Sequence, residues 1–306
     1  MLIKIADLIA ECEQLYGIRI VHGDTVKMKH VKRLRKKLYA LKQEENIVFV
    51  HGIGKRKTQL QKSIETLEDY LNRLKGYTKK LHICGKRNSY SKTDPDATFM
   101  RMKEDAMGNG QLKPTFHLQH GVDSEYIVWL TIGPQPTDTT TLIPFLKKTE
   151  EYLTFKYQKI IADAGYESEE NYVFLDQNQQ LAFIKPSNYE ISKKRKYKND
   201  IGRIENMKYD EKSDSYICKN GKQLPFTHLR RSKSKTGYIS EKNIYQCKEC
   251  KDCPYKKECI KGNNCKTPIE ERNKVLSVAK TFLKYREEDL ERILSDEGIL
   301  LRINRS

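Results

Sequence analysis

The stretch from Lys159 to Tyr172, which reads KIIADAGYESEENY, constrains the fold more than any other part of this sequence. Its short apolar run ends at Asp163, so we expect a strand that presents a single carboxylate at its tip. A metal-binding acid has this setting. Two-metal phosphoryl transfer needs several carboxylates, because two ions must be held ~4 Å apart. The chain offers no convincing second and third acid to accompany Asp163.

The pattern around this stretch predicts an α/β domain. A hairpin of two strands comes first, then a helix, a strand, a helix and a last strand. We place them at residues 115–119 and 126–132 with a loop at 120–125, then at 142–152, 160–162, from about 167, and 181–184. This order predicts the later part of a ribonuclease H-like mixed sheet with helices, and an incomplete one, since its first strand is not obvious. Trp129 is expected in its core, and His117 and His120 on a sheet face.

The N-terminal part has a helical pattern from Lys32 to about Leu81. Two apolar stripes flank the break at Gly52-Ile-Gly54 and predict an antiparallel helical hairpin. Their members are Leu34, Leu38 and Leu41, then Leu60, Ile64, Leu67, Leu71 and Leu74. The stretch GIGKRKT at 52–58 lacks the spacing of a phosphate-binding loop, and we reject that interpretation.

Changes of composition divide the chain into four expected domains. Residues 1–88 form the helical hairpin and residues 89–205 the partial ribonuclease H-like core. Residues 206–266 form a small cysteine-rich insertion of the zinc-ribbon kind, after a basic, loop-rich stretch that begins beyond Lys185. Residues 267–306 form a C-terminal helical segment, with a helix expected from about Ile269 to Leu294.

The charge of the chain favours a polyanionic partner. Lys and Arg number 58 against 41 Asp and Glu, giving a formal net charge of +17. The excess is clustered at residues 27–37, 193–198 and 230–235, which favours nucleic acid, because neutralised phosphates release counterions. A solvated surface is the alternative for any one cluster. The longest apolar run, at 127–132, is too short for a membrane span, and the first residues lack a cleavage site, so we expect a cytoplasmic protein without membrane contact.

Five of the eight cysteines lie between residues 247 and 265. Crowded cysteines in a chain that is not small and secreted favour a metal site over disulfides. The spacing Cys247-x2-Cys250-x2-Cys253-x5-Cys259, with Cys218 upstream, suits structural Zn²⁺, which takes four thiolate or imidazole ligands. An iron–sulfur cluster and unliganded thiols remain open alternatives. Cys265 is expected to be spare.

Several motifs in a fixed order resemble bacterial insertion-sequence transposases of the DDE class. They are SYSKTDPDATFMRMKED at 89–105, NGQLKP at 109–114, PTDTTTLIPFL at 136–146, IADAGYESEENY at 161–172 and IGRIENMKYDEKSDSYICKNGKQL at 201–224, followed by CKECKDCPYKKEC. The resemblance implies a ribonuclease H-like fold with an Asp, Asp, Glu trio. These acids would bind two Mg²⁺ or Mn²⁺ ions and cut and join double-stranded DNA at transposon ends.

The same resemblance assigns residues one by one. Asp163 takes the place of the second Asp. The first Asp belongs to an Asp-Gly-Thr motif upstream of the helical insertion, and the Glu to a helix just past an Arg-Ser pair, so the chain is expected to be an inactive middle fragment. Cys218, Cys250, Cys253 and Cys259 correspond to recurrent cysteines, with Cys247 as an extra candidate ligand. DNA contacts are expected from basic residues in two clusters: Lys193, Lys194, Arg195, Arg230 and Arg231.

Other acids were weighed against the trio. Asp24 follows a plausible short strand at 18–21, whereas Asp94 and Asp96 suit a turn around Pro95. Glu169 and Glu170 are expected to be solvated. Nothing in the sequence marks Glu287 or Glu288 as the third acid. Two other interpretations stay open: a non-enzymatic, zinc-containing remnant that binds DNA or self-associates, and a freestanding metal nuclease in which Asp24 or Asp96 approaches Asp163.

Overall fold

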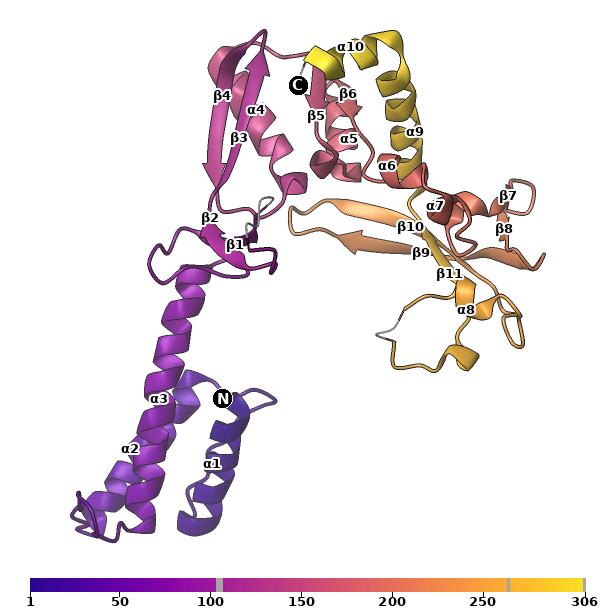
Figure 1. The fold of residues 1–306 in the computed structure, drawn as a ribbon. Helices are drawn as coiled ribbons and strands as arrows, with labels where there is room; N and C mark the ends of the chain where they lie inside the picture. The colour runs from indigo at the N-terminus through magenta and orange to yellow at the C-terminus, as the bar shows by residue number, and fades with distance from the viewer. Residues whose placement is uncertain (103–106, 263–264, 305–306) are drawn as a thin grey trace. The chain divides into compact units, whose positions relative to one another are not determined.

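The computed structural model describes residues 1–102, 107–262 and 265–304 (Figure 1). The last residues of the 89–105 motif and the Arg305-Ser306 pair lie outside these ranges. The chain divides into two compact units, Met1–Thr115 and Phe116–Ser306, and each is described by itself. None of the described helices is both long and apolar enough to cross a membrane.

The N-terminal unit is built on three helices, α1 (Leu2–Tyr16), α2 (Met28–Glu44) and α3 (Gln59–Cys84). The predicted stripes meet between α2 and α3, as the helical hairpin requires, with Leu41 and Leu74 only partly buried. Helix α1, which was not predicted, adds a third apolar face. The strand expected at 18–21 is wrong: Ile18 and Ile20 are buried, but residues 18–21 have no regular secondary structure. Strands β1 (Thr98–Arg101) and β2 (Leu112–Thr115) pair antiparallel.

The C-terminal unit begins with the hairpin of β3 (His117–Asp123) and β4 (Tyr126–Gly133). The loop is shorter than predicted, because Ser124 and Glu125 alone make the turn, with φ of 49° and 77°. Positive φ at both turn residues is the type I′ geometry, whose twist matches that of the paired strands. After η1 (Asp138–Thr140), helix α4 (Leu142–Leu153) packs on one side of the hairpin. A Cβ at Gly121 would lie 3.1 Å from the Phe145 ring.

The side of this hairpin opposite α4 carries apolar side chains that are exposed within the described residues. Leu118, Leu130 and Ile132 share that side and are 58%, 52% and 65% exposed. Trp129 lies on the α4 side, where its ring stacks on Tyr152 at 4.6 Å. The Trp129 side chain is only half-buried, so the expectation that it lies in the core is confirmed only in part.

The predicted strand–helix–strand segment is present as β5 (Lys159–Ala162), η2 (Ala164–Tyr166), α5 (Glu169–Gln177) and β6 (Leu181–Ile184). β5 and β6 pair in parallel, as a helical crossover allows. Helices α9 (Lys280–Leu294) and α10 (Asp296–Asn304) follow later in the chain, and α9 contributes aromatic side chains to the same core. The mixed α/β class is confirmed, but the β3–β4 and β5–β6 pairs form separate sheets within the described ranges.

A five-stranded antiparallel sheet occupies much of the expected loop-rich and cysteine-rich region. Its order is β11-β10-β9-β8-β7, with bounds β7 (Lys208–Asp210), β8 (Ser215–Ile217), β9 (Gln223–Lys233), β10 (Ile239–Gln246) and β11 (Val275–Val278). The single helix expected from Ile269 is therefore wrong at its start, because residues 275–278 alternate in burial and form an edge strand whose Leu276 and Val278 side chains are buried. Short helices connect these parts: α6 (Tyr189–Ser192), α7 (Arg195–Lys198), η3 (Ile204–Asn206), α8 (Lys256–Cys259) and η4 (Ile269–Glu271).

Candidate functional sites

Asp163 lies at the carboxyl end of β5, as predicted. Ile160 and Ala162 of the strand are buried, whereas the Asp163 side chain is exposed and its backbone is still extended, with φ −72° and ψ 163°. The chain then turns through η2 into α5. The carboxyl ends of parallel strands are where open α/β sheets place ligand-binding groups.

A buried ion pair holds the segment that follows Asp163. The Arg286 guanidinium on α9 donates through Nε to Glu167 Oε1 at 2.6 Å and through Nη2 to Oε2 at 2.9 Å. The backbone N–H of Ser187, just past β6, donates to the same Oε2 at 2.8 Å. The Glu167 side chain is only 2% exposed. Bidentate pairing fixes orientation as well as distance, so Glu167 ties the turn after Asp163 to α9 and to the end of β6.

Neutral hydrogen bonds hold the same turn from the other side. Ser168 caps α5 by accepting from the Asn171 N–H at 3.2 Å. The Asn171 amide donates to the carbonyls of Tyr166 at 2.7 Å and Thr139 at 3.2 Å, and the Gln119 amide donates to the Tyr166 hydroxyl at 2.9 Å. The backbone around Asp163 is therefore set by η1, β3 and α5 together.

Asp138 lies beside this turn and is paired with His117. The His117 ring Nε2 is 2.8 Å from Asp138 Oδ1, and its Nδ1 is 3.0 Å from the Gln135 carbonyl oxygen. A Cβ at Gly165 would meet the Asp138 carboxylate, so any side chain there would force Asp138 to shift. His117 was expected on a sheet face, and its contact with Asp138 was not predicted.

A buried carboxylate on α9 was also missed. Asp289 is 0% exposed and accepts from the Tyr172 hydroxyl at 2.9 Å and from the Ile184 backbone N–H at 3.1 Å. Burial raises the pKa of Asp289 to about 6, and the two hydrogen bonds oppose part of that shift. The signal was the helical spacing of Phe282, Asp289 and Ile293, which places Asp289 on the inner face of α9.

The other weighed acids take separate places. Asp24 is exposed in a bend, and Asp94 Oδ1 accepts from the Asp96 N–H at 3.1 Å, which is the predicted turn; all three lie in the N-terminal unit. The expectation that the 169–170 pair is solvated is wrong. Glu169 accepts from the Tyr238 hydroxyl at 2.8 Å and Glu170 from the Thr236 hydroxyl at 2.6 Å, at the turn between β9 and β10.

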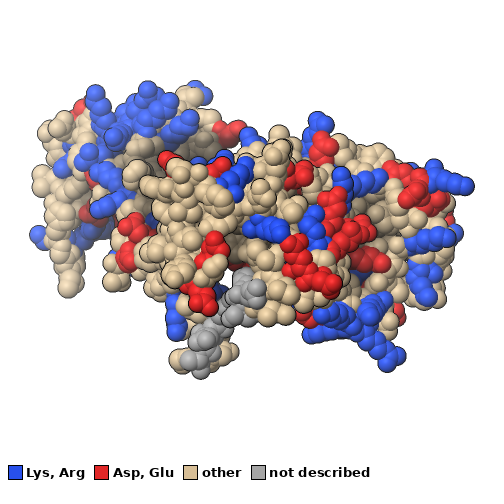
Figure 2. All heavy atoms as spheres, turned by 90° about the horizontal axis from the view of Figure 1, so that it is seen from above, with Lys and Arg blue, Asp and Glu red and all other residues tan. Residues whose placement is uncertain are grey.

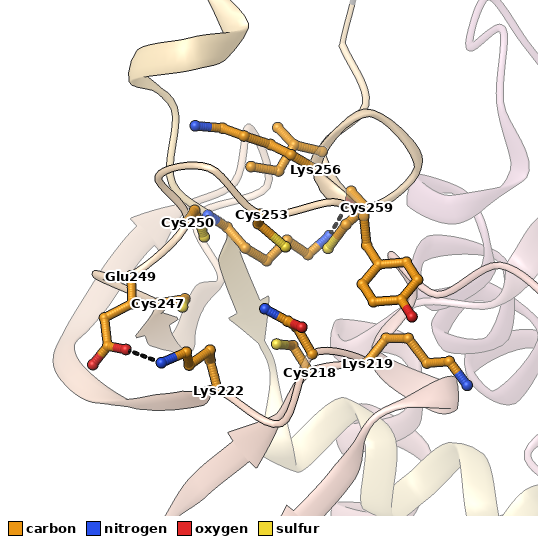
Figure 3. A pocket seen from close by; sticks show the side chains of 13 residues that line it. Cys218, Lys219, Lys222, Cys247, Glu249, Cys250, Cys253, Lys256 and Cys259 are labelled. Atoms are coloured by element: carbon orange, nitrogen blue, oxygen red, sulfur yellow. Dashed lines mark hydrogen bonds and ion pairs between the residues drawn. The ribbon is translucent and has the colours of Figure 1, made fainter.

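Five cysteines line one small cavity of about 20 Å³ (Figure 3). They come from separate elements: the β8–β9 turn, the end of β10, the loop after it and α8. In order they are Cys218, Cys247, Cys250, Cys253 and Cys259. The Lys274 backbone N–H donates to Cys250 Sγ at 3.3 Å, and its Nζ donates to the Cys259 carbonyl at 3.1 Å. Cys265 is exposed and is not among the lining residues.

The cavity favours neutral thiols while no cation is present. Burial raises the pKa of Cys247 to about 11, and the neighbouring Cys250 thiol adds to the rise. Burial also raises the pKa of Cys259, helped by the other cavity thiols and opposed by Lys274. The side chains converge but do not form a ready ligand shell: among residues 1–102, 107–262 and 265–304, no three His, Cys, Asp or Glu side chains are arranged to hold a metal.

The basic residues expected to contact DNA differ in how they are neutralised. In the view of Figure 2, Lys and Arg gather in several groups with acidic surface between them. Lys193 lies 3.3 Å from Glu190 and 3.9 Å from the centre of the Tyr189 ring. Lys194 and Arg195 begin α7. Arg230 and Arg231 are neighbours on β9, so they lie on opposite faces of the sheet.

Residues 217–306 match the family model described as the transposase DDE domain. The match confirms the resemblance: the chain carries DDE-class transposase sequence over this span. It covers the cysteine cavity from Cys218 onward and α9, whereas Asp163 lies before it. Transposases of this class act on DNA and use divalent metal ions. No curated protein and no solved structure matches the chain.

Proposed function

We propose that this chain derives from a transposase whose activity is metal-dependent DNA strand cleavage and transfer at insertion-sequence ends. Asp163 is the carboxylate of this chain that would hold a catalytic Mg²⁺ or Mn²⁺ ion. The observation that carries the proposal is its position, exposed at the carboxyl end of a parallel strand in a turn held by the Glu167–Arg286 pair. The family match at residues 217–306 supports it.

Metal ions in such a site would activate water and then a DNA 3′-hydroxyl for in-line attack on phosphate. The residues of this chain contribute position rather than chemistry. Glu167 and Arg286 would keep the Asp163 backbone in place when the carboxylate meets a cation, and so act as positioning residues. A single exposed carboxylate cannot hold two ions, so we propose that the chain alone is inactive and needs further acids to complete the site.

The cysteine cavity suggests a structural Zn²⁺ site, with Cys218, Cys250, Cys253 and Cys259 as ligands and Cys247 as the alternative fourth thiolate. Support comes from the five thiols that line one cavity and from the Lys274 N–H directed at Cys250 Sγ. Zn²⁺ would compensate the buried charge of the thiolates. An iron–sulfur cluster would use the same donors but would give visible absorption bands, which Zn²⁺ lacks.

A second function is favoured by the same cavity: a zinc-containing remnant that binds double-stranded DNA or self-associates without cutting. Four lysines line the cavity beside its thiols, at positions 219, 222, 256 and 274. Lys222 is paired with Glu249, and the Nζ groups of Lys256 and Lys274 donate to backbone carbonyls, so Lys219 and the basic residues at 193–195 and 230 are the groups that would contact the DNA backbone. This function predicts salt-dependent retention of duplex DNA without strand cleavage under any metal condition.

The test uses the purified chain and supercoiled plasmid with Mg²⁺ or Mn²⁺. We expect DNA binding that weakens with salt and no nicking above background, with Asp163→Asn indistinguishable from the unaltered chain. Nicking that Asp163→Asn abolishes, while Asp176→Asn retains it, would overturn the proposed inactivity and identify a complete site. Absence of DNA retention at low salt would contradict the DNA partner itself.

A further inference from the structure

The β9–β10 hairpin has two faces that differ in how their charges are balanced. On the inner face, which continues into the buried Tyr245, Leu276 and Val278, Arg231 stands opposite Glu241 and its Nε donates to Oε1 at 2.8 Å. On the other face, called the outer face here, Arg230 stands opposite Lys242, and further along β10 the same face reaches the buried Ile244. The sequence assigned Arg230 and Arg231 together, but the pairing register separates them.

Like charges directly opposite each other destabilise a strand pair. None of the ion pairs among the described residues includes Arg230 or Lys242, and the Arg230 contact with the neutral Ser277 hydroxyl is long, at 3.5 Å. Arg230 is exposed and Lys242 half-buried. The pair Ser232 and Ser240, next along the same face, adds two hydroxyl groups. Nothing in the fold of this hairpin requires two cations here.

The hairpin is also held in place rather than left as a free ribbon. Its tip is attached to the first turn of α5 through Thr236 and Tyr238, and the base of β10 pairs with β11. The outer face therefore presents two cations and two hydroxyls at fixed spacing along a strand pair. Arg, Lys and Ser side chains are among the groups that contact the sugar-phosphate backbone of DNA.

We propose that the outer face of the β9–β10 hairpin, carrying Arg230, Lys242, Ser232 and Ser240, binds the phosphate backbone of duplex DNA. The inference rests on the proposed function for the identity of its partner, double-stranded DNA. It adds which surface of the chain contacts that DNA. A bound phosphate would relieve the repulsion between the two cations. The inner face, where Arg231 is already neutralised by Glu241, contributes little.

The test compares two double variants of equal charge change on the full chain. Binding of a labelled duplex is measured by fluorescence anisotropy across a series of salt concentrations. R230Q/K242Q should lower the slope of log affinity against log salt by roughly 1.8, because each phosphate contact contributes about 0.9. R231Q/K233Q, on the inner face, should lower it by less than half as much. R230K/K242R keeps both charges and should keep the slope.

Folding is controlled in the same series. The melting temperature of R230Q/K242Q should equal or exceed that of the unaltered chain, because the substitution removes a repulsive pair. Equal slope changes in both double variants, or an unchanged slope in R230Q/K242Q, would overturn the inference while leaving the DNA partner standing. Failure of the unaltered chain to bind would instead overturn the proposed DNA partner, and this inference with it.

Discussion

The end of β5 and the cysteine cavity differ in two respects: how firmly their backbone is held, and how many side chains of the same kind they bring together. At the end of β5, side chains from α5, α9 and the chain after β6 hold the backbone, yet one carboxylate faces outward. In the cavity, five thiols face one another, yet Cys250 Sγ accepts only one backbone donor of 3.3 Å. The first region thus combines a firmly held backbone with one exposed carboxylate, whereas the second brings five thiols to one cavity without arranging them around a common point.

The largest effect should come from breaking the ion pair that holds the first region. Arg286→Met leaves the Glu167 carboxylate buried without its partner, and we expect a loss of about 3–5 kcal/mol of unfolding free energy in urea titrations. The double variant Glu167→Gln/Arg286→Met should lose less, because it leaves no charge uncompensated. Lys284→Met, at an exposed site of the same helix, serves as the control and should change little. A loss under about 1 kcal/mol for Arg286→Met would show that the turn after Asp163 does not depend on this pair.

Removing metal should affect the second region. If Zn²⁺ is bound at a concentration about a thousandfold above its Kd, a chelator should lower the unfolding free energy by about 4 kcal/mol. Elemental analysis should find about one Zn per chain. Cys253→Ser/Cys259→Ser should abolish both the metal and the response to chelator, whereas Cys265→Ser, outside the cavity, should keep both. A metal-free chain that ignores the chelator would contradict the zinc proposal.

A smaller effect should appear in the pH dependence of stability. The pKa of Asp289 is about 6 in the folded chain against an ordinary 3.8, so between these values the folded state binds more protons than the unfolded state. The contribution of Asp289 to stability is therefore greatest below pH 4 and falls by up to about 3 kcal/mol as the pH rises to 6, then stays constant.

Asp289→Asn should remove this fall, and the difference between variant and parent isolates it from the other carboxyl groups. Glu288→Gln, its partly exposed neighbour on α9, is the control and should follow the parent across the range. If Asp289→Asn and the parent lose stability in parallel between pH 4 and 6, the carboxyl is not protonated in the folded chain.

Elements were predictable from the sequence where apolar residues recur at a regular helical or strand spacing or form a continuous apolar run. Helices α2, α3, α4 and α5 and strands β5 and β6 show clear apolar periodicity, and Asp163 could be placed because it directly follows one of them. β9 and β10 were not predicted, because the Arg-Arg-Ser-Lys-Ser run resembles a loop; the strand is polar on both faces along much of its length. Only the pairing register could show that Arg230 and Arg231 have different partners.

The candidate sites were predictable to the extent that their residues are close in sequence. Cys250, Cys253 and Cys259 follow local spacing, and the structure places them on one cavity together with Cys218 and Cys247. The residues around Asp163 could not be assigned in this way. Glu167 and Arg286 are 119 positions apart, and Asp289 lies 117 positions from Tyr172. A carboxylate buried by tertiary packing has no local signature beyond its position on the inner face of a helix.

The exposed apolar side chains on the side of the β3–β4 hairpin opposite α4 have a consequence for how the molecule behaves in solution. Leu118, Leu130 and Ile132 expose more than half of their surface to water on one side of the strand pair. A contiguous apolar area of this kind promotes association between copies, while a net charge of +17 keeps them apart. Colloidal stability thus depends on the balance between apolar attraction at this strand surface and long-range charge repulsion. Added salt screens the repulsion and will shift the balance toward precipitation.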